Sequence, residues 1–387
     1  MQPIQIPKSE NSNLAQPKTA FKKYFIIATA AIGVFFVALI LFIKFDTAGA
    51  AQFTDTVLRP LIGARQVIAL ERLFYNSSDA LNRLTAADVK QESPLVDATT
   101  QKVAIKSAPG LSQSPVMTQA ATPLPGEGQW KAVPFKDLIS STVAEQTFIR
   151  PDKERSFAYA TLIELDMSKL QLFSVAGTKE PGGKVGKPGP GVIPLEVQKS
   201  GKLLAAFDGG FQYSDGQYGM IVGKQTYLPL QRDLATLIGS ANGKLEILKY
   251  AGQPVDADVT FVRQNCPMLI DKGQIGLNNE EDKKLWGRTL TSDIYTWRSG
   301  IGLTPNGNLI YAVGNSLTPT TLAIALKAAG AVTAMQLDIN PFWVRFSIFD
   351  AFKDGNYQSS SLMKGMYNGH QEFLKGDAKD FFYIVKK

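Results

Sequence analysis

Two aspartates stand at points where short apolar runs end. Asp208 follows the run 203–207, and Asp338 follows the run 334–337. Runs of this length and composition are typical of buried strands, so each carboxyl group is expected where a strand becomes a loop. Loops at strand ends commonly carry binding and catalytic groups. A carboxylate in such a place can carry a proton or act as a nucleophile.

The chain contains one histidine, His370, and one cysteine, Cys266. A Ser-His-Asp or Cys-His centre would have to use that histidine, and a surface or packing role is the simpler interpretation. Neither an intrachain disulfide nor a zinc site of the usual ligand sets is expected. We expect no cofactor, although an all-oxygen calcium site stays open because Asp and Asn are plentiful. Carboxylates are therefore the first candidates for any chemistry.

The composition favours a globular body that does not bind nucleic acid. The chain has 387 residues, 44% of them hydrophobic, which is enough for a sizeable core and one or two domains. Its formal net charge is +7. The Lys and Arg residues are nevertheless dispersed, with no dense basic run interleaved with aromatic residues. We therefore expect no nucleic-acid partner.

An uncharged stretch of twenty residues, 24–43, is long enough to cross a bilayer as a helix at about 1.5 Å per residue. Four Lys residues lie in the tail 1–23, against three cationic residues over the same distance afterwards. The positive-inside rule then favours a cytoplasmic tail and an extracytoplasmic body. Ala48-Gly49-Ala50 fits a signal-peptidase pattern, but the apolar core exceeds that of usual signal peptides, which favours an uncleaved anchor.

The composition divides the rest of the chain into three parts. Residues 44–84 are predicted to form a stalk, because apolar residues from Val67 to Leu84 recur on one helical face. Self-association or membrane contact through this stalk stays open. Residues 85–128, rich in Ser, Thr, Gln, Ala and Pro, are typical of a flexible linker. The globular domain is expected to span 129–387.

The globular domain shows alternating strand and helix signals. Strand-like runs at 157–165 and 170–176 flank a turn, which predicts a hairpin. Runs at 299–303 and 309–313 flank Asn306-Gly307, which favours a turn and predicts a second hairpin. Thr318-Pro319 offers a helix cap with proline in the first turn, and an Ala/Leu-rich helix is expected over 320–329. This order predicts an α+β fold, a mixed sheet with hairpins and packed helices, preceded by one N-terminal transmembrane helix.

Several segments between Phe157 and Phe349 resemble, in order and spacing, those of the phosphodiester glycosidase family. Phe207-Asp208-Gly209-Gly210-Phe211 is similar to the family's Asn-Gly-Gly-Phe-Phe, and 218–224 to its Gly-hydrophobic-Gly-Lys. The segments 265–270, 298–303 and 334–338 are similar to its Gly-Pro-aliphatic strand, its Arg-Thr-Ala-Ile-Gly and its Ala-Leu-Asn-Leu-Asp. The family includes the lysosomal uncovering enzyme and bacterial relatives linked to exopolysaccharide metabolism.

The chain departs from the family pattern at both aspartates. Members typically continue after the second Asp with Gly-Gly-Gly-Ser, whereas this chain has Ile339-Asn340-Pro341-Phe342, and Asp208 stands where Asn is usual. Glycines let backbone amides approach a ligand, while Pro341 removes one amide donor. Either the substrate differs or the site no longer hydrolyses.

The resemblance implies a site for a sugar joined through phosphate. A carboxylate would stabilise an oxocarbenium-like centre or activate water, with Asp338 as the first candidate, Asp208 as the second and Arg298 as the phosphate partner. The implied substrate contacts are Gly209, Gly210, Arg263, Gln264, Asn265, Asn340 and Trp343, and no metal is implied. Simpler roles stay open, namely turn or cap residues for the aspartates, stacking or surface pairing for Arg298 and packing for Trp343.

The resulting hypothesis is a membrane-anchored extracytoplasmic hydrolase that cleaves a glycosyl phosphodiester in envelope polysaccharide. Its expected partners are the membrane and a carbohydrate or sugar-phosphate substrate. The alternative is a non-catalytic module of the same fold that binds envelope glycan. A third interpretation is a structural envelope component that assembles through its stalk helix.

Overall fold

The computed structural model divides the chain into a unit of residues 1–50 and a unit of residues 51–387. It describes residues 53–85, 92–96, 110–112, 114–135, 142–182, 186–276, 295–349 and 357–387. The predicted tail 1–23 and span 24–43 lie outside the described residues. Within the described ranges, no helix combines the length and the apolar character that a membrane crossing requires.

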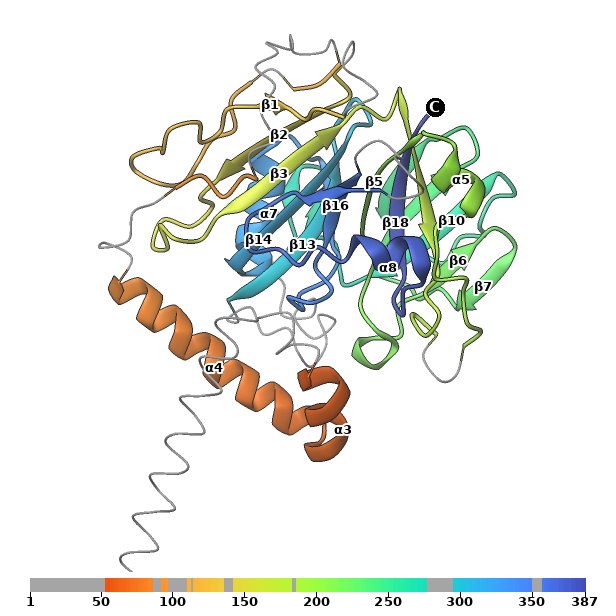
Figure 1. The fold of residues 1–387 in the computed structure, drawn as a ribbon, viewed down its shortest axis with the longest axis horizontal. Helices are drawn as coiled ribbons and strands as arrows, with labels where there is room; N and C mark the ends of the chain where they lie inside the picture. Colours follow the sequence, from red (N-terminus) through yellow and green to blue (C-terminus); the bar gives the residue numbers. More distant parts are fainter. Residues whose placement is uncertain are drawn as a thin grey trace, which may run out of the picture. The chain divides into compact units, whose positions relative to one another are not determined.

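The largest sheet of the described part has eight strands (Figure 1). Their order is β1 (Lys131–Ala132), β2 (Ala144–Ile149), β3 (Ala160–Leu165), β14 (Leu309–Leu317), β13 (Thr296–Leu303), β15 (Thr333–Gln336), β11 (Ile270–Asp271) and β12 (Gln274–Ile275). Every residue of β13 is buried, so this strand is covered on both faces. Strands of this kind read as continuous apolar or small-residue runs rather than alternating ones.

Two five-stranded sheets complete the body, and β10, β6 and β7 lie on the side away from β1 to β3 (Figure 1). One has the order β7 (Gln225–Leu228), β6 (Met220–Val222), β10 (Val259–Asn265), β8 (Ala235–Ser240) and β9 (Leu245–Lys249). The other has the order β17 (Ser359–Ser361), β16 (Phe346–Phe349), β5 (Leu203–Asp208), β18 (Phe381–Lys386) and β4 (Leu170–Val175). The strand pairs recorded in all three sheets are antiparallel.

The helices of the described part are few. They are the π-helix η1 (Thr54–Leu58), α3 (Arg59–Ile62), α4 (Ala64–Thr85), α5 (Leu195–Lys199), the 3-10 turn η3 (Tyr213–Asp215), α7 (Pro319–Ala328) and α8 (His370–Lys375). Helix α7 begins as predicted, because Thr318 caps it and accepts a hydrogen bond from the Thr321 backbone amide. Its apolar side packs on the largest sheet. The prediction of an α+β fold is confirmed, with strands in the majority.

One predicted hairpin is confirmed and the other is wrong. Strands β13 and β14 pair directly across the turn at 304–308. Strands β3 and β4 follow each other in sequence but lie in different sheets, where β3 pairs with β2 and β14 and β4 pairs with β18. The turn after β3 therefore carries the chain from one sheet to another.

A group of aromatic rings fixes the end of β5. The Phe207 ring centroid lies 5.6 Å from that of Phe346, 5.2 Å from that of Tyr311 and 5.3 Å from that of Phe382. These residues come from β5, β16, β14 and β18, so one cluster joins two of the sheets. Aromatic contacts of this kind add about 0.5–1.5 kcal/mol each beyond area burial. The next residue, Asp208, is held in place as a result.

The predicted stalk helix is present as α4, but its apolar residues do not share one environment. Val67 is 1% exposed, whereas Leu70, Leu81 and Leu84 are largely exposed. Helix α4 is attached to the body through Asp79, whose two carboxylate oxygens accept hydrogen bonds from Arg155 at 2.8 and 2.9 Å. Its roles in self-association and membrane contact remain proposals.

Part of the segment predicted as a flexible linker packs on the domain. Val116 is buried, and the Glu127 carboxylate accepts hydrogen bonds from the Arg150 guanidinium. The ordered body therefore begins before residue 129. Composition could not show this, because the packing depends on Arg150, which lies outside the segment.

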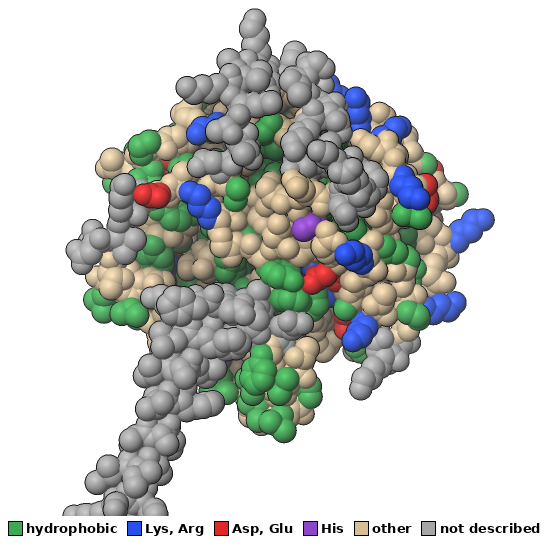
Figure 2. Space-filling model, in the orientation of Figure 1, with side chains coloured by type: hydrophobic (Ala, Val, Ile, Leu, Met, Phe, Trp, Pro, Cys, Tyr) green, Lys and Arg blue, Asp and Glu red, His purple; other side chains and the backbone are tan. Residues whose placement is uncertain are grey.

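Charged side chains do not gather on the face of the body shown in Figure 2. Lys and Arg residues lie there singly among other types. This distribution matches the dispersed basic residues of the sequence.

Candidate active site

The two aspartates that the sequence singled out meet at Ser299 of β13. The Ser299 hydroxyl donates to Asp208 Oδ2 at 2.5 Å and accepts from the Asp338 backbone N–H at 3.1 Å. The Ser299 backbone N–H also donates to the Asp338 carbonyl at 2.9 Å. Residues more than a hundred positions apart in sequence are therefore joined through one hydroxyl.

Asp208 is enclosed by hydrogen-bond donors rather than exposed at a loop. It is 2% exposed, and its Oδ1 accepts from the Tyr311 hydroxyl at 2.7 Å and from the Arg345 backbone N–H at 3.3 Å. Burial raises its pKa to about 7, the Ser299 and Tyr311 hydrogen bonds oppose that rise, and the nearby Asp338 charge adds to it. Its carboxyl group therefore accepts hydrogen bonds from residues of other segments of the chain. A local turn residue would bond only to its own neighbouring backbone.

Asp208→Asn is expected to flatten the dependence of stability on pH. The pKa is about 7 when folded against a usual value of 3.8, so between these values the folded state keeps a proton that the unfolded state has lost. Stability should then fall as pH rises through that window. Because one pKa unit corresponds to about 1.4 kcal/mol, the fall should exceed about 1.4 kcal/mol in the wild type. Urea unfolding at both ends of the window checks this, and an unchanged slope in the variant would contradict it.

Asp338 has both carboxylate oxygens occupied. Oδ1 accepts from the backbone N–H groups of Ile339 at 2.7 Å and Asn340 at 2.9 Å, so the loop turns around this side chain. Oδ2 accepts from the ammonium group of Lys379. Asp338 is 2% exposed, as is Lys379.

Lys379 is the cationic partner of Asp338, and the sequence interpretation missed it. Burial lowers its pKa, but the carboxylates of Asp338 and Asp380 outweigh that effect and the net shift is upward. It stays a cation beside Asp338. The only signal in the sequence was its position: Lys379 and Asp380 stand just before the apolar strand β18. Asp208 and Asp338 likewise stand next to apolar runs, but at their ends.

Arg263 lies beneath the Gly209-Gly210 loop, away from solvent. Its Nε and Nη2 donate to the two oxygens of Asp380 at 2.8 and 3.0 Å, and it is 0% exposed. Further N–H groups donate to the backbone carbonyls of Phe211 and Tyr218. With its donors engaged in this way, Arg263 supports the loop, and the structure does not place it as the substrate contact that the sequence suggested.

The two glycines are needed for this support. A Cβ on Gly209 would lie 2.0 Å from Asp380 Oδ2, and one on Gly210 would lie 2.6 Å from Arg263 Cζ. The Gly210 N–H also donates to Asp380 Oδ2 at 3.1 Å. Close approach to the buried ion pair therefore accounts for the glycines without any ligand.

Gly209→Ala is expected to destabilise the protein by about 1–3 kcal/mol, the usual effect of overpacking a buried site. The added methyl group would meet the fixed Asp380 carboxylate. Denaturant unfolding of the variant measures the loss. Gly276→Ala serves as a control, because a Cβ there makes an ordinary contact with the Met268 carbonyl oxygen at 3.4 Å and Gly276, like Gly209, has no positive φ. A loss for Gly209→Ala no greater than for the control would contradict the argument.

Arg298 faces away from the two aspartates. Successive strand residues point to opposite faces, and its neighbour Ser299 points to Asp208. Its Nε donates to the Leu317 carbonyl at 2.8 Å and its Nη1 to Gln336 Oε1 at 3.1 Å. Burial lowers its pKa to about 9. The structure does not bring Arg298 to Asp338, where the resemblance had placed a phosphate partner.

Gln264 and Asn265 tie backbone segments together. Gln264 Oε1 accepts from the Gln231 backbone N–H at 2.7 Å, and Gln264 Nε2 donates to the carbonyl of the same residue at 2.9 Å. Asn265 Oδ1 accepts from the Phe211 backbone N–H at 3.2 Å, while its Nδ2 donates to the Leu337 carbonyl at 2.5 Å. Asn265 therefore joins the two acidic loops, whereas Gln264 holds the segment at Gln231.

Asn340 and Trp343 lie next to Asp338. Asn340 Oδ1 accepts from the Phe342 backbone N–H at 2.9 Å, which closes the loop. The Trp343 ring is half-buried, and its centroid lies 5.5 Å from Lys379 Nζ. Of the predicted substrate contacts, these two are half-buried whereas the others are buried, and the Asn340 backbone N–H donates to Asp338.

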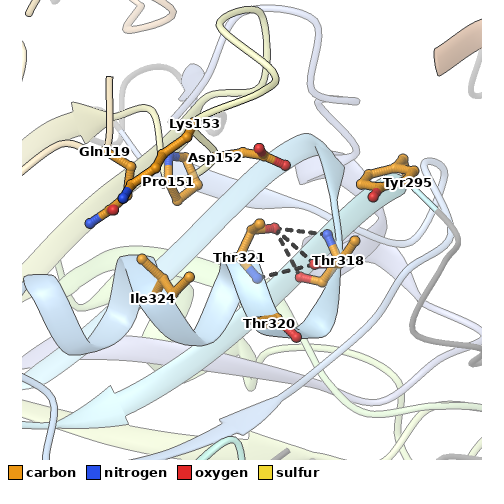
Figure 3. Close-up of a pocket in the computed structure, with 9 residues that line it drawn as sticks. All are labelled: Gln119, Pro151, Asp152, Lys153, Tyr295, Thr318, Thr320, Thr321 and Ile324. Carbon is orange, nitrogen blue, oxygen red and sulfur yellow. Dashed lines mark hydrogen bonds between the residues drawn. The ribbon is translucent and has the colours of Figure 1, made fainter. Parts of the chain in front are cut away.

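A cavity of about 380 Å³ lies elsewhere, at the start of α7 (Figure 3). Its lining includes Thr318 and Thr321, whose hydroxyls are used in the helix cap, and Asp152, which pairs with Arg155. It contains neither Asp208 nor Asp338. Among the described residues, no cluster of His, Cys, Asp and Glu suited to a metal ion is found.

The comparison with protein families defines the class. Residues 201–338 match the family model described as phosphodiester glycosidase, and this range contains Asp208, Arg263, Ser299 and Asp338. The match covers the part of the chain in which the motifs had predicted this family.

Two solved structures are similar to the chain at low identity. One is the zebrafish N-acetylglucosamine-1-phosphodiester alpha-N-acetylglucosaminidase catalytic domain auto-inhibited by pro-peptide, at 14% identity and a TM-score of 0.41, covering 67% of this chain and 88% of that one. The other is a hypothetical protein from Synechocystis, at 13% identity and a TM-score of 0.32, covering 63% of this chain and 62% of that one. No curated protein matches.

Proposed function

We propose that the domain hydrolyses a glycosyl phosphodiester and that Asp338 is the carboxylate of the reaction. The observation that carries this proposal is the family match over a range that ends at Asp338, the residue that pairs with the buried Lys379. The leaving group of such a substrate is a phosphate monoester, which is already a stable anion. The main need is therefore stabilisation of positive charge at the anomeric carbon.

The contacts of Asp338 suit that role. Two backbone amides and the Lys379 ammonium hold its oxygens, so the side chain is fixed before substrate arrives. Preorganised charge of this kind stabilises a developing opposite charge without reorganisation. Asp208 contributes indirectly, because it orients Ser299, which in turn holds the Asp338 backbone.

We further propose that the domain acts outside the cytoplasm, on polysaccharide of the cell envelope, while anchored through residues 24–43. Support comes from the uncharged sequence of that stretch and from the distribution of cationic residues around it. Protease protection in sealed cells, with a tag at each end, tests the orientation. Digestion of the C-terminal tag alone from outside is expected.

A glycan-binding module without turnover is the second candidate. It is favoured by the loop after Asp338, where Pro341 lacks an amide donor and Phe342 is buried against Tyr367 with ring centroids 4.8 Å apart. A loop filled in this way offers fewer backbone donors to a phosphate than glycines would.

Release of phosphate monoester separates the two candidates. The full chain in detergent would be given the methyl diesters of several sugar 1-phosphates, with and without calcium. Catalytic release supports the hydrolase. Saturable binding of these compounds without release supports the binding module.

A further inference from the structure

Glu180 lies against the segment that carries Lys379 and Asp380. Its backbone N–H donates to the Ala378 carbonyl at 2.9 Å, and the Lys179 N–H donates to the same carbonyl at 3.0 Å. A Cβ on Gly177 would lie 2.3 Å from the Lys379 backbone carbonyl carbon. The loop that carries Glu180 is thus in direct contact with the chain beside the partner of Asp338.

Among the described residues, one oxygen of the Glu180 side chain is held by a hydrogen bond. Oε2 accepts from the Tyr213 backbone N–H at 2.8 Å, and the residue is half-buried. Within the described residues, no hydrogen bond is recorded to Oε1. Asp338 differs, because both of its oxygens already accept hydrogen bonds. Of these two carboxyl groups, Glu180 is therefore the one with a second oxygen that has no recorded partner among the described residues and can accept a hydrogen bond from water.

The charges around Glu180 come from three elements. Burial raises its pKa, and Asp380 adds to that rise, while the Tyr213 amide, Lys379 and Arg263 oppose it. The net shift is upward from the usual value of 4.5. A carboxylate with a raised pKa is a stronger base at neutral pH than an exposed one.

Resting on the proposed function, we propose that Glu180 is the general base of the hydrolysis and that Asp338 is the charge-stabilising carboxylate. The oxygen of a water molecule forms a bond to the anomeric carbon. The bond from that carbon to the bridging phosphate oxygen breaks, and its electron pair leaves with the phosphate monoester. One proton of the attacking water passes to Glu180. Two carboxylates with separate roles, set by different surroundings, are the usual arrangement for glycoside cleavage.

The test compares Glu180→Gln with wild type in the full chain, using the methyl diester of a sugar 1-phosphate that the wild type cleaves. The amide keeps an acceptor for the Tyr213 N–H, so the fold should survive. A fall in kcat of about 10²–10⁴-fold is expected, with KM little changed. The wild-type rate should rise with pH through a value above 4.5, and that rise should be absent in the variant. Glu180→Asp, which keeps a shorter carboxylate, should retain part of the activity and the rise with pH.

Glu196→Gln is the matched control, because Glu196 is exposed on α5. It should leave the rate unchanged. A Glu180→Gln protein that is folded, keeps kcat within about threefold and keeps the same rise with pH would overturn the role of Glu180 alone. A wild type that cleaves none of the diesters would instead overturn the proposed function, on which the role of Glu180 depends.

Discussion

Lys379→Met is expected to remove activity and to destabilise the protein by about 3–5 kcal/mol at neutral pH. The substitution leaves the Asp338 carboxylate buried without its cation, since the two side chains are each 3% exposed. A buried charge that loses its partner keeps its desolvation cost without compensation. Urea unfolding gives the loss of stability, and phosphate release gives the loss of activity.

The double variant Lys379→Met with Asp338→Asn sharpens this prediction. Because it removes both charges, it should recover much of the lost stability while remaining inactive. Lys386→Met is the control for removing a lysine, since Lys386 is exposed. A single Lys379→Met variant as stable as this control would show that the Asp338–Lys379 pair does not hold the loop.

Arg263→Met is expected to be the most destabilising substitution outside the reacting groups, at about 3–5 kcal/mol. It would leave Asp380 buried and unpaired and would remove the donors that hold the Phe211 and Tyr218 carbonyls. Buried acceptors that lose their donors cost further free energy. Activity should fall as well, because the Gly209-Gly210 loop rests on this pair.

Arg232→Met is the matched control, because Arg232 is exposed and its recorded hydrogen bond is to the Ala251 carbonyl. Denaturant unfolding of the two variants side by side makes the comparison. If both variants lose the same small free energy of unfolding, Arg263 does not support the loop in the way that the structure indicates.

Local signals in the sequence were sufficient where a structure depends on neighbours in the chain. Thr318-Pro319 marked the start of α7, and Asn306-Gly307 marked the turn between β13 and β14. The hairpin predicted from β3 and β4 failed because β4 pairs with β18, at the far end of the chain. A turn signal shows that the chain reverses but does not show which strand the next one will join.

Some residues of the site could likewise be predicted from local sequence signals, and others could not. Asp208 and Asp338 were expected at the ends of buried strands, and the structure places them there and joins them through Ser299. Arg298 was predicted as a phosphate partner beside Asp338, but the sequence could not show which way its side chain points, because β13 is buried on both faces and its residues do not alternate between apolar and polar. Lys379 was missed because it reaches Asp338 only through a contact between segments distant in sequence, and Glu180 meets the neighbouring residue Ala378 in the same way.

We propose Asp338 as the carboxylate of a glycosyl phosphodiester hydrolase. The most direct test measures phosphate-monoester release by the full chain in parallel for the wild type, Asp338→Asn and the control Asp256→Asn, whose aspartate is exposed. We expect release by the wild type and the control, and none above background by folded Asp338→Asn. Release by Asp338→Asn at the wild-type rate would contradict the account.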